Sequence, residues 1–136
     1  RGTDFRTYPW GDERPDSSRG NFNYFVGDTT RVGNYPAGAS PYGILDMAGN
    51  VAEWISDYSD GDYYTQGADV NPTGPGARSQ FFNRVVRGGT FQDVFKDIRL
   101  ANRASVHGSN PQADDPYSED YLGEFSPKIG FRCASD

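Results

Sequence analysis

The chain has 136 residues, a net charge of −6 and a mean hydropathy of −0.79. It lacks the cluster of Lys and Arg that marks nucleic-acid-binding proteins. No apolar run approaches the ~18–20 residues that cross a membrane, so we expect neither nucleic-acid binding nor membrane insertion.

The length fits one domain, residues 1–136, and the composition predicts a domain with little regular structure. Nine Phe, nine Tyr and two Trp supply much of the apolar surface, while 17 Gly and 9 Pro predict many turns. This aromatic content is well above that of a disordered chain. We therefore expect a folded domain in which aromatic side chains hold irregular loops.

The N-terminal third predicts loops with short strands. In residues 1–42, turn-forming residues are frequent, and residues 21–28 read NFNYFVGD. The Asn and Gly of this stretch make it a poor strand, so it predicts a loop pinned by its aromatic residues.

The next segment predicts a short helix. Residues 43–58 place apolar side chains at spacings of three and four, and Asp46 is a candidate N-cap. Gly49 and Asn50 interrupt the pattern early, so only two or three turns are expected.

Farther along, residues 84–87 read RVVR before Gly88 and predict a strand. Two long polar surface loops are expected over residues 59–83 and 107–127, and a closing strand over residues 128–133. Residues 91–103 read equally well as a strand or as irregular structure. The candidate core residues of this segment are Phe95, Ile98, Leu100 and Ala101.

The chain has one cysteine and one histidine, which excludes several kinds of cross-link and catalytic site. With one cysteine, Cys133, no internal disulfide can form, and the redox compartment stays undetermined. Cys133 is either a buried apolar residue or half of an intermolecular bridge. The one histidine, His107, is expected to be an exposed loop residue, and no catalytic triad, P-loop or dinucleotide fingerprint is present.

Four strings carry a family resemblance across nearly the whole chain. They read YPWG at 8–11, GILDMAGNVAEW at 43–54, RVVRGGTF at 84–91 and GFRC at 130–133. Together and in this order they resemble the formylglycine-generating enzyme family, also called the sulfatase-modifying-factor family.

The resemblance implies a fold and a portion of it. The expected fold is α+β and C-type-lectin-like, with short twisted strands, one or two short helices and much irregular loop. Family members usually carry a further N-terminal portion before YPWG, which is absent here. We therefore expect the C-terminal portion of the family domain: a fragment, a processed product, or a piece completed by a second chain.

The resemblance also implies structural calcium. In the family the Asn and Glu of the GNVAEW-type string lie at a calcium site, which here corresponds to Asn50, the backbone carbonyl of Val51, and Glu53. Calcium takes six to eight hard oxygen ligands of these kinds. The alternative is that Asn50 and Glu53 only form hydrogen bonds within a turn. For a second family site the nearest equivalents are Asn21, the carbonyl of Phe22, and Asp28.

Catalysis is where the chain departs from the family. The oxygen-dependent enzyme holds copper with two cysteines shortly after the RGGS string, and Cu(I) favours such soft ligands. Residues 91–103 contain no cysteine, so we expect no copper centre and no formylglycine generation by this chain itself. A second branch of the family uses iron held by three histidines, which a chain with one histidine cannot supply.

The leading hypothesis is therefore a non-catalytic, calcium-stabilised binding or scaffold module, extracellular or in the cell envelope. A protein partner or a second chain is expected, with a glycan as another candidate ligand. Two alternatives stay open: an accessory domain of an enzyme whose catalytic residues lie in another domain or chain, and a structural subunit of an extracellular or envelope assembly. At least two of four arginines are expected to pair with carboxylates or carbonyls: Arg87, Arg99, Arg103 and Arg132.

Overall fold

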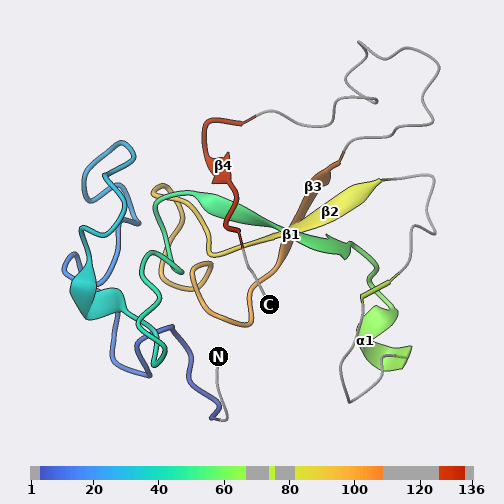
Figure 1. Ribbon diagram of the computed structural model, residues 1–136, viewed down its shortest axis with the longest axis horizontal. Coiled ribbons are helices and arrows are strands. Elements are labelled where there is room, and N and C mark those ends of the chain that lie inside the picture. Colours follow the sequence, from blue (N-terminus) through green and yellow to red (C-terminus); the bar gives the residue numbers. More distant parts are fainter. Residues whose placement is uncertain (1–3, 67–73, 76–81, 109–125, 134–136) are drawn as a thin grey trace.

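A computed structural model of the chain describes residues 4–66, 74–75, 82–108 and 126–133 (Figure 1). Its regular core is a four-stranded sheet with the order β3-β2-β1-β4. The pairs β1–β2 and β2–β3 are antiparallel, whereas β1–β4 is parallel. The strands are β1 Ala52–Tyr58, β2 Asn83–Arg87, β3 Ala104–His107 and β4 Ile129–Gly130.

Helix is nearly absent from the described residues. A 3₁₀ turn, η1, covers Pro36–Gly38, and one helical turn, α1, covers Tyr63–Gln66. The N-terminal loops lie beside one end of the sheet, and α1 lies beyond the far end of β1 (Figure 1). The fold is thus mostly strand and irregular loop, with less helix than the expected α+β description implies.

The predicted helix over residues 43–58 is wrong, because its second half is β1. Three backbone positions ahead of the strand lie in the left-handed region: Asp46 at φ 55°, Gly49 at 81° and Asn50 at 67°. No right-handed helix continues through such residues. Asp46 is not an N-cap; its Oδ2 accepts the Gly33 amide at 2.6 Å.

Pairing on both sides of β1 explains why the strand prevails. Trp54 lies opposite Val86 of β2, and Ala52 pairs with Ile129 of β4. A bulge between Trp54 and Tyr58 shifts the register with β2. These are contacts between distant segments, so a window of local spacing cannot contain them.

Some of the other expected strands and loops agree with the structure, and some do not. The strand over 84–87 is confirmed as β2, and the closing strand over 128–133 contains β4. β3 ends at the first residue of the supposed second loop, so His107 is a half-buried strand residue and not the exposed loop residue that we expected. Cys133 is exposed, which contradicts the first of its two alternatives, a buried apolar residue. The first supposed loop contains α1 and the first residue of β2, and the parts of both loops at residues 67–73, 76–81 and 109–125 lie outside the described residues.

A small aromatic core lies outside the sheet and holds the irregular segments together. Tyr8, Phe22, Ala48 and Ile98 form a buried cluster, with Trp10 packed against it. Segment 91–103 is irregular, and Ile98 is its anchor at 1% exposure, whereas Phe95 is 58% exposed and does not face the core as the sequence suggested. Aromatic burial thus substitutes for regular structure here.

The loop over residues 21–28 is pinned by aromatic residues, as expected. The rings of Phe22 and Phe25 meet edge to face at 4.8 Å, and those of Tyr24 and Phe91 at 6.0 Å. Asn23 and Tyr24 also donate their amides to the carbonyls of Asp93 and Phe91. The loop is therefore tied directly to the segment that follows β2.

Candidate functional site

A pocket of about 390 Å³ lies on one face of the sheet, and all four strands contribute to it. Its apolar lining consists of strand residues that point to this face: Ala52, Val86, Ala104, Val106 and Ile129. Ala52 and Val86 are buried. An apolar floor on a rigid sheet with a few polar groups around it is the usual build of a ligand site.

The segment after β2 forms the polar wall of this pocket. Gly88 and Gly89 turn the chain with φ of 90° and 72°. A Cβ on Gly89 would lie 2.9 Å from Cγ2 of Ile98, so only glycine allows the wall to pack this closely. Asp93 then closes the turn, because its Oδ2 accepts the Thr90 amide at 2.7 Å.

Hydrogen bonds between segments fix the polar groups of the wall. Lys128 Nζ donates to Gln92 Oε1 at 2.9 Å and joins the wall to the approach to β4. Asn102 Nδ2 donates to the Asp97 carbonyl at 2.7 Å. The pocket thus presents the carboxylates of Asp93 and Asp97 beside an ammonium group, which suits recognition by hydrogen bonds and ion pairs.

The pocket does not fit copper. Its donors are carboxylates, amides, hydroxyls and a lysine, whereas Cu(I) prefers thiolates. Cys133, the one cysteine of the sequence, is exposed, follows β4 and is absent from the lining. No thiolate chemistry can therefore be built on the lining residues of this pocket.

Asn50, the first predicted calcium ligand, is the hub of a buried hydrogen-bond network. It is 6% exposed, and its Oδ1 accepts from the Thr30 amide at 2.8 Å, the Thr30 hydroxyl at 3.3 Å and Asn21 Nδ2 at 3.3 Å. Its Nδ2 donates to the Thr30 carbonyl at 3.1 Å. This amide therefore joins two N-terminal loops to the start of β1.

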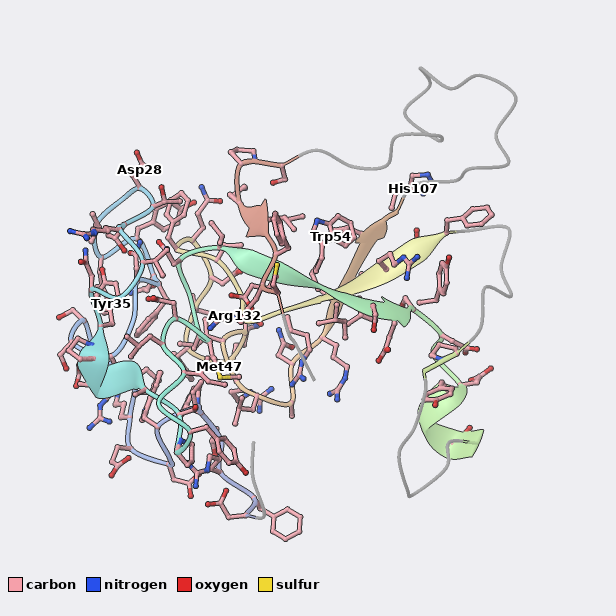
Figure 2. All side chains as sticks on the ribbon, in the orientation of Figure 1. Asp28, Tyr35, Met47, Trp54, His107 and Arg132 are labelled. Carbon is pink, nitrogen blue, oxygen red and sulfur yellow. The ribbon has the colours of Figure 1, made fainter. Side chains whose placement is uncertain are left out.

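Glu53, the second predicted ligand, is paired with Arg132. Both carboxylate oxygens accept from the guanidinium, the shortest distance being 2.7 Å. The hydrogen bond to Glu53 raises the pKa of Arg132, against the opposing effect of burial. Figure 2 shows Arg132 beside β1, so the pair fastens the C-terminal end of the described chain to the sheet.

The structure brings together only part of the second predicted calcium site, which consists of Asn21, the carbonyl of Phe22, and Asp28. Asn21 is fully buried, and its Nδ2 donates to the Asp28 carbonyl at 2.7 Å. The Asp28 side chain instead accepts the Thr29 amide and lies at the outer edge of the N-terminal loops (Figure 2). Phe22 places its ring in the aromatic core.

One atom of this set stands out. The Oδ1 of Asn21 is buried and has no hydrogen-bond partner among the described residues. A buried amide oxygen without a donor costs free energy, and a hard cation is one partner that would satisfy it. No group of three His, Cys, Asp or Glu side chains in the described part of the chain could hold a metal, so such an ion would depend on amide and carbonyl oxygens.

The four arginines singled out by the sequence all bond to protein oxygens, as expected. Arg87 donates to the Leu100 carbonyl, Arg99 to Lys96 and Arg103 to Ala101, while Arg132 holds Glu53. Three of the four thus brace backbone carbonyls in segment 91–103, which has little regular structure of its own.

The pocket, its Gly-Gly wall and the Gly49-Asn50 hub include residues of two of the four sequence strings, 43–54 and 84–91. The model of the sulfatase-modifying factor enzyme 1-like domain matches residues 1–136. The chain belongs to this family. Within the described residues of this family member, no helix is long and apolar enough to span a bilayer.

Relatives of this sulfatase-modifying-factor domain are longer proteins. A serine/threonine-protein kinase pkn1 of Chlamydia pneumoniae is 40% identical over 95% of this chain and 18% of its own length. The formylglycine-generating enzyme of Streptomyces coelicolor is 31% identical over 96% of this chain and 41% of its own. The domain therefore spans less than half of either relative.

Two solved structures are similar in fold to this chain. PvdO from Pseudomonas aeruginosa matches with a TM-score of 0.64 at 23% identity, over 91% of this chain and 41% of that one. Treponema denticola variable protein 1 matches with a TM-score of 0.60 at 22% identity, over 96% and 40%. Identities this low show likeness of fold alone.

Proposed function

We propose that this domain is a non-catalytic binding module of the sulfatase-modifying-factor family, with the pocket on the sheet as its recognition site. The observation that carries the proposal is the chemistry of the pocket. Its floor is rigid and apolar, and its wall offers Asp93, Asp97 and Lys128 but no thiolate. Loops on a rigid scaffold commonly carry recognition.

A protein partner fits this pocket, because the polar wall offers both signs of charge over an apolar floor. The neighbouring surface adds exposed aromatic groups: Tyr24 is 58% and Phe25 47% exposed, on the loop that bonds to Phe91 and Asp93. Aromatic side chains are enriched at protein interfaces.

The test is a selection of displayed peptides on the intact domain, followed by affinity measurements on variants. Asp97→Lys reverses a wall charge, and within the described part of the chain the hydrogen bonds of Asp97 are made by its backbone, so folding should survive. We expect selected peptides to bind the Asp97→Lys variant at least about tenfold more weakly, a loss of ~1.4 kcal/mol. Asp62→Lys, an exposed residue outside the pocket lining, is the matched control. Equal loss in both variants, or in neither, would contradict the assignment of the pocket.

An accessory role within a larger enzyme is the second candidate. It is favoured by the relatives, of which this domain makes up only a part. In that case the pocket would shape a substrate whose chemistry is performed by residues of another domain or chain.

Calcium belongs to the proposal as a stabilising ligand. The buried Oδ1 of Asn21 supports an ion at the second predicted set. At the first set, an ion would have to exchange with the donors that now occupy Asn50 and with Arg132 at Glu53.

Chelation tests the calcium proposal. We expect EDTA to lower the melting temperature and added calcium to restore it, because an ion that binds only the native state stabilises it by RT ln(1 + [L]/Kd). Asn21→Ala should abolish this response if the second set holds the ion, and Glu53→Gln should abolish it if the first does. If elemental analysis finds bound calcium and its removal leaves the melt unchanged, the stabilising role is refuted.

A further inference from the structure

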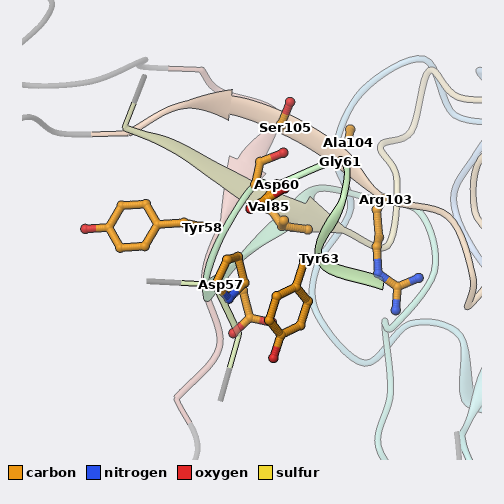
Figure 3. A pocket seen from close by; sticks show the side chains of 11 residues that line it. Asp57, Tyr58, Asp60, Gly61, Tyr63, Val85, Arg103, Ala104 and Ser105 are labelled. Atoms are coloured by element: carbon orange, nitrogen blue, oxygen red, sulfur yellow. The ribbon is translucent and has the colours of Figure 1, made fainter. Parts of the chain in front are cut away.

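A second pocket, of about 200 Å³, lies on the opposite face of the sheet (Figure 3). Val85 lines it, whereas the next residue of β2, Val86, lines the first pocket. Since alternate residues of a strand point to opposite faces, the two pockets open on different faces of the sheet, and Ala104 is the residue that both linings share. The remaining walls come from the end of β1, the turn at 59–61, α1, Pro75, and the start of β3 with the residues before it.

The polar lining of this pocket combines acceptors and donors. Asp57 and Asp60 supply carboxylates, Arg103 supplies a guanidinium, and Ser105 and Tyr63 supply hydroxyls. In Figure 3 the Tyr63 and Arg103 side chains stand on either side of the opening, while the Tyr58 ring points away. That ring is already covered by Arg84, 3.9 Å from its centroid.

The lining groups are held in place before any ligand arrives. Asp60 Oδ1 accepts the Asp62 amide at 2.8 Å, and the Tyr63 hydroxyl accepts the Gly74 amide at 3.0 Å. Gly74 packs so closely that a Cβ there would lie 2.6 Å from Oδ1 of Asp57. Side chains fixed in this way lose little entropy on binding.

The charged side chains that line this pocket favour some classes of ligand over others. Two carboxylates disfavour an anion, and the guanidinium of Arg103 disfavours a cation. An apolar ligand would displace water from these charged side chains without replacing its hydrogen bonds. A polyhydroxylated ring satisfies them all, because each hydroxyl both donates, to a carboxylate, and accepts, from a guanidinium or hydroxyl.

We propose that this second pocket binds a single sugar ring, either free or as the terminal residue of a glycan. Val85 supplies the apolar floor for a ring face, and Asp57, Asp60 and Arg103 take the hydroxyls. This inference stands apart from the proposed function, since it concerns the other face of the sheet and does not need the first pocket to bind anything.

Amide chemical-shift mapping on the full chain tests the proposal. The probes are glucose, galactose, mannose and N-acetylglucosamine, each also as its methyl glycoside, with N-acetyl-lysine amide and inorganic phosphate in separate titrations. We expect at least one neutral sugar to shift the amides of Gly61 and Ser105, which line this pocket and not the first. A glycoside that binds as well as the free sugar indicates a glycan terminus, and a preference for the free sugar indicates a free ligand.

Two variants and a control keep the result interpretable. Asp57→Asn should weaken sugar binding about tenfold, and Ser105→Trp should abolish it by filling the pocket. Asp62→Asn, outside the lining, should change neither affinity nor melting temperature. The proposal is overturned if no sugar shifts these amides, if only the lysine amide or phosphate does, or if the shifts persist in Ser105→Trp.

Discussion

Gly49→Ala should cost about 3–5 kcal/mol of unfolding free energy, a large part of the stability of so small a domain. Two effects combine at this position. The backbone lies at φ 81°, which any side chain strains, and an added Cβ would lie 2.3 Å from the Asn21 carbonyl oxygen. That oxygen accepts the Asn50 amide and cannot retreat without breaking the bond.

Urea denaturation measures this cost, and Gly27→Ala is the matched control. Gly27 has φ 86°, yet a Cβ there meets nothing within 4 Å. The control should therefore lose only the left-handed strain, ~1 kcal/mol. If both variants lose the same amount, the close packing of Gly49 against Asn21 is not part of what stabilises the fold.

Asn50→Ala is the second large effect, with an expected loss of about 3 kcal/mol. The substitution leaves the Thr30 amide and carbonyl without their partners and removes the acceptor of Asn21 Nδ2. Asn50→Gly should be less harmful than Asn50→Ala, because φ is 67° and only the hydrogen bonds are then lost.

The control for this pair of variants is Asn23, which shares the left-handed backbone at φ 50° but is exposed. Asn23→Ala should lose only the strain contribution, about 1 kcal/mol. Thermal melts of the three variants would separate strain from hydrogen bonding. An Asn50→Ala variant as stable as Asn23→Ala would show that the Asn50 network contributes nothing net.

These positions also explain what the sequence could predict. The family strings identified the family, and the β-branched run at 84–87 identified β2, because both signals can be read from short stretches of sequence. The segment around Asn50 misled, since the spacing of Leu45, Ala48, Val51 and Ala52 is helical while the actual structure depends on left-handed residues and on pairing with β2 and β4. Local periodicity cannot represent partners that are 30 or more residues away.

Some features of the candidate site could also be predicted from the sequence, and others could not. The missing cysteines in residues 91–103 were visible in the sequence, and so was the need of the arginines for oxygen partners. The pocket itself was not, because its lining comes from four strands and two connecting segments that meet only in the folded chain. The Glu53–Arg132 pair, 79 residues apart, was equally hidden. An Asn flanked by glycine ahead of a strand was the one local signal for the buried hub.

We expect the pocket on the sheet to bind a ligand without oxidising it, and an assay for formylglycine formation tests this. The purified full chain is incubated with copper, oxygen, a reductant and a cysteine-containing peptide pool, and mass spectrometry follows conversion of cysteine to formylglycine. The formylglycine-generating enzyme of Streptomyces coelicolor serves as positive control. We expect no formylglycine from this chain and no copper retained after dialysis. Catalytic turnover above the copper-only blank would contradict the account.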